Sequence, residues 1–277
     1  MPNPIVEEWK HVTMLIKNES GKIGTGFLVK RDMEDKQYKL FLVTNKHVID
    51  PDPNKRNNAK AITLHCNVEK NDGTIEKEEI HYMLDFVDGA KAWREHVDAD
   101  TDVLAIDITP IIAEFGDLKR KHVTYDLLAD KKTLEEYNIT IGDEIAVIGY
   151  PLGLKHKSAN YPLFRKGTIA SNIGEQLEIS MLDGGKERDR NIRGFLIDGA
   201  TSPGSSGSPV ILYPGIHFKN GNNVEIRGGK PFLLGIVSES RIAIVEHNYG
   251  DYPNLSGLSI IFDADTIKET IELFFQI

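Results

Sequence analysis

Short apolar segments recur along the whole chain, and most of them are rich in β-branched residues. Polar stretches with turn formers such as Asn-Gly, Asp-Gly and Gly-Lys separate them. This spacing of short runs and turns predicts an all-β protein, either a sandwich or a barrel. The expected strands cover residues 12–16, 26–29, 40–44, 61–64, 103–108, 144–148, 176–181, 195–197, 209–212, 232–237 and 258–262.

Turn signals strengthen this pattern. The sequences Asn-Asp-Gly at 71–73 and Asn-Gly-Asn at 220–222 are typical of hairpin turns. The polar, glycine-rich stretch 213–230 predicts a long surface hairpin or loop. Strands and turns therefore account for most of the chain.

Helical signals are few. Asp263 can cap a final helix over residues 264–275, where apolar residues recur at helical spacing, and a short helix is expected at 132–137. The charged stretch 111–139 has few strand signals and indicates a connection between two lobes. We therefore expect a single domain over 1–277, with an N-terminal lobe at 10–112, a connection at 113–140 and a C-terminal lobe at 141–277.

Composition narrows the function. With 277 residues, 40% of them hydrophobic, the chain can form one large domain or two small lobes around a sizeable core. The net charge of −9 disfavours a nucleic-acid partner, which requires a concentrated basic surface. Cys66 is the only cysteine, so no intramolecular disulfide can form, which fits a reducing compartment.

Targeting and cofactor signals are missing from the sequence. Residues 1–10 lack the apolar core of a signal peptide, and no apolar stretch is long enough to cross a bilayer, so we expect a cytoplasmic protein without membrane contact. The nine histidines show no metal-ligand spacing, and no glycine-rich phosphate loop precedes a helix. We expect neither a metal nor a cofactor.

Three local patterns carry candidate chemistry. In the first, a predicted strand ends at Thr44 and His47 follows in a short turn. A histidine suits proton transfer because its unperturbed pKa lies near neutrality. In the second, Asp102 directly precedes an apolar strand, where its carboxylate can orient a histidine; Asp98 and Asp100 are competitors. Each pattern alone is better explained by a structural or surface role.

The third pattern is Gly204-Ser-Ser206-Gly-Ser-Pro, in which glycines bracket a serine before a buried strand. Gly204 allows a turn that aims the amides of Gly204 and Ser206 at one spot, where they form an oxyanion hole. Serine is a weak nucleophile at its own pKa and therefore needs a nearby base. A structural glycine-serine loop explains this segment alone equally well.

The joint order of the histidine, aspartate and serine motifs resembles the trypsin/chymotrypsin-like serine peptidases. The resemblance covers residues 12–277 and is strongest to the disulfide-free bacterial branch that includes HtrA-type proteases. Other segments that resemble this branch are Gly-Thr-Gly-Phe at 24–27, the run 141–153 ending in Gly-Tyr-Pro-Leu-Gly, Gly-Thr-Ile-Ala-Ser at 167–171 and Leu-Gly-Ile-Val-Ser at 234–238.

The resemblance implies two six-stranded antiparallel β-barrels with a C-terminal helix, and a serine endopeptidase. It assigns Ser206 as nucleophile, His47 as general base and Asp102 as the group that orients the histidine. The amides of Gly204 and Ser206 would receive the oxyanion, and a protein or peptide would be the substrate.

Two positions depart from the family pattern. Ser205 stands where trypsin-type members carry an aspartate that pairs with a newly cut N-terminus, so activation by that ion pair is not expected. Ser208 stands where glycine is usual, and a small serine is expected to fit. The α/β-hydrolase nucleophile elbow is also excluded, because its second glycine and its strand–helix context are missing.

The same resemblance places Ala200, Ser238 and Gly257 around the primary specificity pocket and Ser240 at its entrance. None of them carries a charge, so we expect cleavage after small or medium apolar residues. Glu239 either faces neighbouring substrate positions, where it would favour basic residues, or points to solvent.

Two other functions remain open for the same fold. The chain could be a catalytically silent peptide-binding or scaffold module, with loops 183–193 and 213–230 serving a partner. It could also be a protease that stays inactive until an activating protein partner orders its oxyanion loop.

Overall fold

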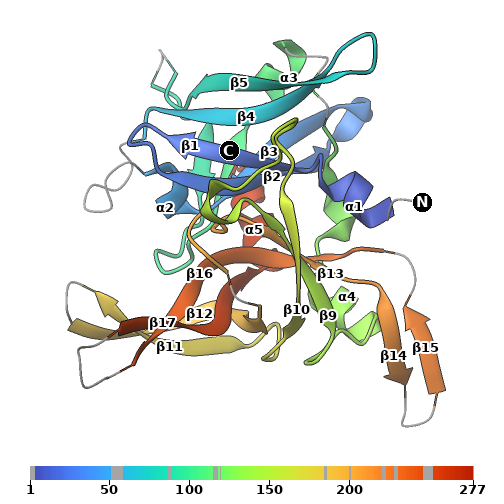
Figure 1. Ribbon diagram of the computed structural model, residues 1–277, viewed down its shortest axis with the longest axis vertical. Coiled ribbons are helices and arrows are strands. Elements are labelled where there is room, and N and C mark those ends of the chain that lie inside the picture. Colours follow the sequence, from blue (N-terminus) through green and yellow to red (C-terminus); the bar gives the residue numbers. More distant parts are fainter. Residues whose placement is uncertain are drawn as a thin grey trace.

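The computed structural model describes residues 4–50, 59–86, 89–114, 118, 120–183, 186–199, 201–219, 223–227, 230–245 and 252–276. Its strands form two antiparallel sheets, which occupy the upper and lower halves of Figure 1. The first sheet has the order β5-β4-β1-β2-β3-β7-β6, with β8 added in parallel to β2. Its strands are β1 (Thr13–Asn18), β2 (Ile23–Asp32), β3 (Tyr38–Thr44), β4 (Ala61–Glu69), β5 (Ile75–Met83), β6 (Trp93–Glu95), β7 (Leu104–Asp107) and β8 (Val123–Thr124).

The second sheet closes on itself. Its order is β10-β9-β13-β16-β17-β12-β11, and pairing of β10 with β12 completes a six-stranded barrel, with β11 outside the ring. A separate hairpin of β14 (Gly215–Lys219) and β15 (Asn223–Arg227) projects from it (Figure 1). The strands of this second sheet are β9 (Glu144–Gly149), β10 (Leu163–Ile169), β11 (Gln176–Asp183), β12 (Lys186–Asp198), β13 (Pro209–Leu212), β16 (Leu233–Val245) and β17 (Tyr252–Asp263).

Helices are short, and the last one was predicted. The helix α5 (Ala264–Glu272) begins where the sequence indicates, because the Asp263 side chain accepts a hydrogen bond from the Thr266 amide. The helix α4 (Lys131–Glu136) is within one residue of its expected position. Sequence reasoning missed α1 (Pro4–Trp9), α2 (Lys46–Ile49) and α3 (Thr109–Glu114), which are too short to show a helical period.

Each of the eleven expected strands overlaps an observed strand, whereas β5, β6, β8 and β10 were not expected. The all-β architecture with two antiparallel sheets and a C-terminal helix is confirmed, and of the two expected six-stranded barrels one, in the second sheet, closes in the described part of the chain. The turn at 71–73 joins β4 to β5, and Gly73 adopts a φ of +81° there. The turn predicted at 220–222 lies outside the described residues. Within the described part of the chain, no helix has the length and apolar character needed to span a bilayer.

A shared core lies between the two sheets. Successive side chains of β2 and β3 point to opposite faces of the first sheet. Leu28 and Leu42 pack in the core of the first sheet alone, while Phe27 and Phe41 pack in the core shared with the second sheet. The side chains of β9 likewise alternate between the shared core and the core of the second sheet alone, and Ile267 of α5 packs in the shared core. Burial on both faces explains the uninterrupted apolar runs of these strands. The candidate site lies at this junction.

Candidate active site

The structure brings His47 and Asp102 together. The Nδ1 atom of His47 lies 2.5 Å from Oδ2 of Asp102, and the His47 backbone amide donates to Oδ1 at 3.2 Å. His47 lies in α2, the short helix that follows β3, and Asp102 lies two residues before β7, the strand paired with β3. The carboxamide of Asn45 donates to the Asp102 carbonyl at 2.6 Å. Both side chains are thus fixed by neighbouring strands of the first sheet.

The ionised form of Asp102 is favoured at this position. Burial acts to raise the pKa of its carboxyl, but the charge and hydrogen bonds of His47 outweigh burial and hold the pKa below its usual range. The ammonium of Lys46 acts in the same direction. A carboxylate that accepts two hydrogen bonds from one histidine residue orients its ring and fixes the proton on Nδ1.

The two competing acids have other roles. Asp98 shapes the loop before Asp102, since its carboxylate accepts bonds from the Asp100 amide at 3.1 Å and the Thr101 hydroxyl at 2.8 Å. Asp100 lies 3.5 Å from the guanidinium of Arg190 on β12. Neither carboxylate contacts His47 in the described contacts, so the structure selects Asp102 as the partner of the histidine.

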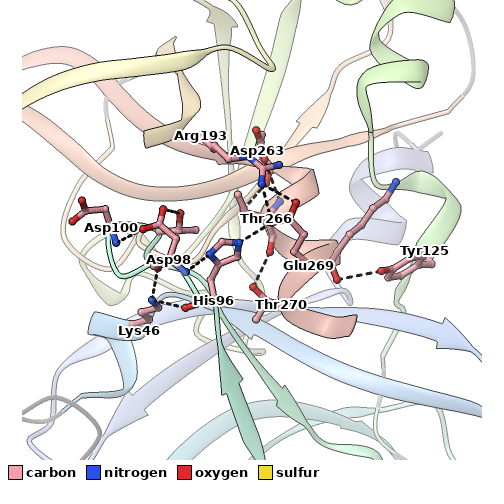
Figure 2. A network of polar contacts seen from close by, with 12 residues as sticks. Lys46, His96, Asp98, Asp100, Tyr125, Arg193, Asp263, Thr266, Glu269 and Thr270 are labelled. Atoms are coloured by element: carbon pink, nitrogen blue, oxygen red, sulfur yellow. Dashed lines mark hydrogen bonds and ion pairs between the residues drawn. The ribbon is translucent and has the colours of Figure 1, made fainter. Parts of the chain in front are cut away.

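The loop that bears Asp102 is supported from two sides (Figure 2). The Lys46 ammonium donates to the carbonyls of His96 and Asp98, each at 3.1 Å. On the other side, His96 accepts from the Asp98 amide on Nδ1 at 3.1 Å and lies 2.9 Å from Glu269 of α5 through Nε2. Both carboxylate oxygens of Glu269 in turn accept hydrogen bonds from the guanidinium of Arg193 on β12. The chain of contacts connects the C-terminal helix to the loop of Asp102.

The loop of Ser206 consists of two consecutive turns. The Ser205 amide donates to the Ser202 carbonyl at 2.9 Å, and the Ser208 amide donates to the Ser205 carbonyl at 3.0 Å. The third residue of each turn is a glycine with positive φ: Gly204 at +91° and Gly207 at +86°. A turn with positive φ at this position favours glycine strongly. The glycines that the sequence singled out are therefore required by the backbone.

These turns leave two amides directed away from the loop. The Leu152 amide donates to the carbonyl of Pro203 at 2.6 Å, and the Ser205 carbonyl is held by Ser208. A trans peptide points its N–H opposite to its carbonyl, so the amides of Gly204 and Ser206 face the other side. Among the described residues, neither amide has a hydrogen-bond acceptor. Two such donors beside a serine could bind a negatively charged oxygen.

The Ser206 hydroxyl is oriented toward β16. It donates to the Ser238 carbonyl at 2.9 Å, and the described contacts include no bond between it and the His47 ring. The Ser238 hydroxyl itself lies 3.4 Å from Oδ2 of Asp102. Ser238 therefore contacts both halves of the site, with its carbonyl toward Ser206 and its hydroxyl toward Asp102.

Four further positions predicted for substrate binding are described only in part. Ala200 lies outside the described residues. The backbones of Glu239 and Ser240 pair with Ile260 and Ser259 on β17, while their side chains lie outside the described part. Gly257 has a φ of +82°, and its carbonyl accepts from the Gly199 amide at 3.0 Å. The pocket assignment stays a prediction.

A cavity of about 270 Å³ opens beside the His47–Asp102 pair. Ser238 also lines it, and its remaining walls come from β11, β12, β17 and the loop before Asp102. The carboxylate of Asp102 keeps 23% of its surface exposed there. This cavity, which sequence reasoning did not predict, is formed by elements distant in sequence, including Ile179, Arg190 and Phe262.

Departures from the family pattern at the serine loop have a local explanation. Ser205 is buried, and its hydroxyl accepts from the Ser202 amide at 3.3 Å, so it stabilises the first turn. Ser208 is fully buried against Gly149, where an added Cβ would lie 1.9 Å from the Ser208 hydroxyl. The small serine fits because a glycine faces it.

A two-sheet β fold with an Asp–His pair on one sheet and a glycine-flanked serine loop on the other is the chymotrypsin-like fold. The sequence agrees, because a family model described as a trypsin-like peptidase domain matches residues 24–215. The chain belongs to this family of trypsin-like peptidase domains.

Solved structures match over nearly the whole chain. The inactive form of the Rv3671c protease of M. tuberculosis is 16% identical, with a TM-score of 0.50, and the match covers 98% of this chain and 92% of that chain. The active form gives the same identity and TM-score, covering 97% and 83%. These likenesses show the fold and do not distinguish the two forms. A comparison with curated proteins finds no match.

Proposed function

We propose that the chain is a serine endopeptidase in which Ser206 is the nucleophile, His47 the general base and Asp102 the group that orients the base. The observation that carries the proposal is the hydrogen-bonded His47–Asp102 pair. It is accompanied by a serine loop with two amides that have no acceptor among the residues the structure describes. A peptidase of this class needs these groups together, and membership of the trypsin-like family supports the proposal.

The reaction is acyl transfer from a peptide to water. The Ser206 hydroxyl attacks the substrate carbonyl while Nε2 of His47 takes its proton, and the Asp102 carboxylate stabilises the resulting imidazolium. The amides of Gly204 and Ser206 bind the oxyanion, and His47 then protonates the leaving amine. Water activated by the same histidine hydrolyses the acyl-enzyme and restores Ser206.

The resting hydroxyl of Ser206 must first leave Ser238. Its hydrogen bond to the Ser238 carbonyl is a ground-state contact that a bound peptide or a partner could displace by competing for that carbonyl. This contact favours a second form of the proposal, in which the peptidase is activated by its substrate or by a protein partner. In either form, rotation about the Cα–Cβ bond of Ser206 would release its hydroxyl from Ser238.

Specificity for small or medium apolar residues before the scissile bond belongs to the same proposal. It rests on the uncharged positions Ala200, Ser238, Ser240 and Gly257. A peptide library measures it directly, and cleavage mainly after arginine or lysine would contradict it. The substrate is accordingly a protein or a peptide.

Labelling with a fluorophosphonate tests the proposed nucleophile, because the reagent reacts with an activated serine hydroxyl. We expect rapid labelling of the wild-type chain and none of Ser206→Ala, since alanine has no hydroxyl to phosphonylate. The matched control is Ser208→Ala, which removes a buried hydroxyl that has no hydrogen-bond partner among the described residues. That variant should label at the wild-type rate.

Three outcomes separate the alternatives. Labelling of the free chain supports a constitutive peptidase, and labelling that needs an added peptide or partner supports the activated form. A chain that stays unlabelled under all these conditions would contradict the proposal and favour a peptide-binding module on the same fold.

A further inference from the structure

Thr25 on β2 belongs to the first sheet but bonds the serine loop of the second. Its side chain is fully buried, and its hydroxyl donates to the carbonyl of Gly204 at 2.8 Å. The same oxygen accepts a bond from the Tyr150 amide at 3.2 Å. One hydroxyl thus joins β2, the serine loop and the segment that follows β9.

The backbone of Thr25 strengthens this junction. Its amide donates to the Ser206 carbonyl at 2.8 Å, and its own carbonyl accepts the hydroxyl of Thr44 at 2.7 Å. Thr44 is the last residue of β3, three residues before His47. Thr25 is therefore held by the strand that leads to the histidine, while it holds the carbonyls of Gly204 and Ser206.

Both peptide groups that flank Gly204 are anchored through their carbonyls. The Leu152 amide holds the carbonyl of Pro203, and the Thr25 hydroxyl holds that of Gly204. Gly204 has a φ of +91°, a region in which glycine meets little steric resistance to rotation of a neighbouring peptide. The two hydrogen bonds supply the restraint that the missing Cβ cannot, so they set the direction of the Gly204 amide.

We infer that Thr25 is a positioning residue for the oxyanion hole, acting through its hydroxyl on Gly204; this inference rests on the proposed peptidase function. Removal of the hydroxyl leaves a buried carbonyl without its donor, and the peptide that follows Gly204 keeps only the bond from the Ser205 amide to the Ser202 carbonyl. Oxyanion binding requires a donor aimed at the position of the charge in the transition state. The loss should therefore appear in turnover and leave substrate binding unchanged.

Thr25→Val tests this inference, because valine has nearly the shape of threonine and cannot donate. We expect kcat on a peptide substrate to fall roughly 10- to 100-fold, the loss that a misplacement of about 1 Å can cause, with KM within about twofold of wild type. Thr25→Ser keeps the hydroxyl and should restore most of kcat. A simple loss of packing would instead leave the serine variant, which lacks a methyl group, as the weaker enzyme.

Thr270→Val is the matched control. Thr270 is also fully buried, and its hydroxyl also donates to a backbone carbonyl, that of Thr266 in α5, at 2.7 Å. This variant should lose stability as Thr25→Val does while keeping the wild-type kcat. An equal loss of kcat in both variants, or a Thr25→Val enzyme within twofold of wild type, would overturn the inference.

A second measurement does not depend on turnover. The Leu152 amide, bonded to Pro203, should exchange its hydrogen faster in Thr25→Val than in wild type or Thr270→Val, because the loop it anchors is less restrained. Unchanged exchange at Leu152 would overturn the positioning role even in an active enzyme. A wild-type chain that resists the fluorophosphonate would instead count against the peptidase proposal, and the exchange result would still decide the role of Thr25.

Discussion

The two halves of the candidate site are held in different ways. The His47–Asp102 half, built on the first sheet, is fixed by side chains: the carboxamide of Asn45, the ammonium of Lys46 and the carboxylate of Asp102 each make bonds that determine its geometry. The Ser206 half, built on the second sheet, is fixed by its backbone through two turns and anchored carbonyls.

This difference predicts different sensitivities. A half held by charged and polar side chains should fail when a functional group changes at constant shape. A half held mainly by backbone should tolerate most changes of functional group, those at Ser206 and at its side-chain anchor Thr25 excepted, and should fail when an added atom or a forbidden dihedral angle disturbs its turns. Four substitutions extend this comparison, beginning with the largest expected effect.

Asp102→Asn changes a functional group at nearly constant shape. The amide cannot accept both bonds from His47 as a carboxylate does, so the ring loses the tautomer that leaves Nε2 free to take the serine proton. We expect kcat to fall on the order of 10⁴-fold, with near-normal folding and KM. Steady-state kinetics with a peptide substrate measures the loss. A fall of less than tenfold would show that the side-chain contacts of this half matter little.

Gly207→Ala adds one atom to the backbone-held half. The new Cβ would lie 1.9 Å from the Thr25 carbonyl, at a φ of +86°. Gly142→Ala is the control, since Gly142 has a φ of +90° and nothing within 4 Å of the added atom. Urea unfolding should show a loss of about 1 kcal/mol for the control, from the dihedral angle alone, and about 3 kcal/mol or more for Gly207→Ala. Equal losses would mean that the loop moves freely to accept a side chain.

Asp263→Asn tests the helix that supports the loop of Asp102. Burial raises the pKa of Asp263 to about 6, well above its unfolded value, so the folded state binds the extra proton between about pH 4 and 6. The stability of the wild type should therefore fall, relative to the asparagine variant, as the pH rises through this window. Above pH 7 the free energy of unfolding of the asparagine variant should exceed that of the wild type by about 2 kcal/mol, because asparagine caps a helix equally well.

Asp130→Asn should change the pH dependence of stability in the direction opposite to Asp263→Asn. Asp130 caps α4, and the bonds from Thr133 lower the pKa of its carboxyl to about 2. Its contribution to stability is present above the unfolded pKa and is lost as the pH falls toward 2. The asparagine variant should thus lose stability relative to wild type as the pH rises through that range. The same sign for both variants in urea titrations at several pH values would refute the assignment of burial as the cause at Asp263.

Sequence reasoning predicted those parts of the fold and site that a local pattern of residues encodes. Apolar runs marked the strands, Asp263 marked the start of α5, and the glycines marked the turns around Ser206. The place of Asp102 just before an apolar strand separated it from Asp98, because that strand, β7, pairs with β3, the strand that leads to His47.

The remainder depends on contacts between residues far apart in the chain. Thr25 was noted only as part of a strand motif, since its hydroxyl meets Gly204 across 179 residues and no local pattern encodes that contact. The bond of Ser206 to Ser238 likewise depends on a side-chain rotation that the sequence does not specify. Strand β5 was missed because four successive exposed residues, 76–79, interrupt its apolar alternation.

The core between the sheets has a thermodynamic consequence. Residues such as Phe27 and Phe41 lose packing partners if either sheet unfolds, because side chains of both sheets form the shared core. The shared core therefore couples the stability of the two halves, although each sheet also has a core cluster of its own. The candidate active site takes one residue set from each half, so unfolding of either sheet should abolish it.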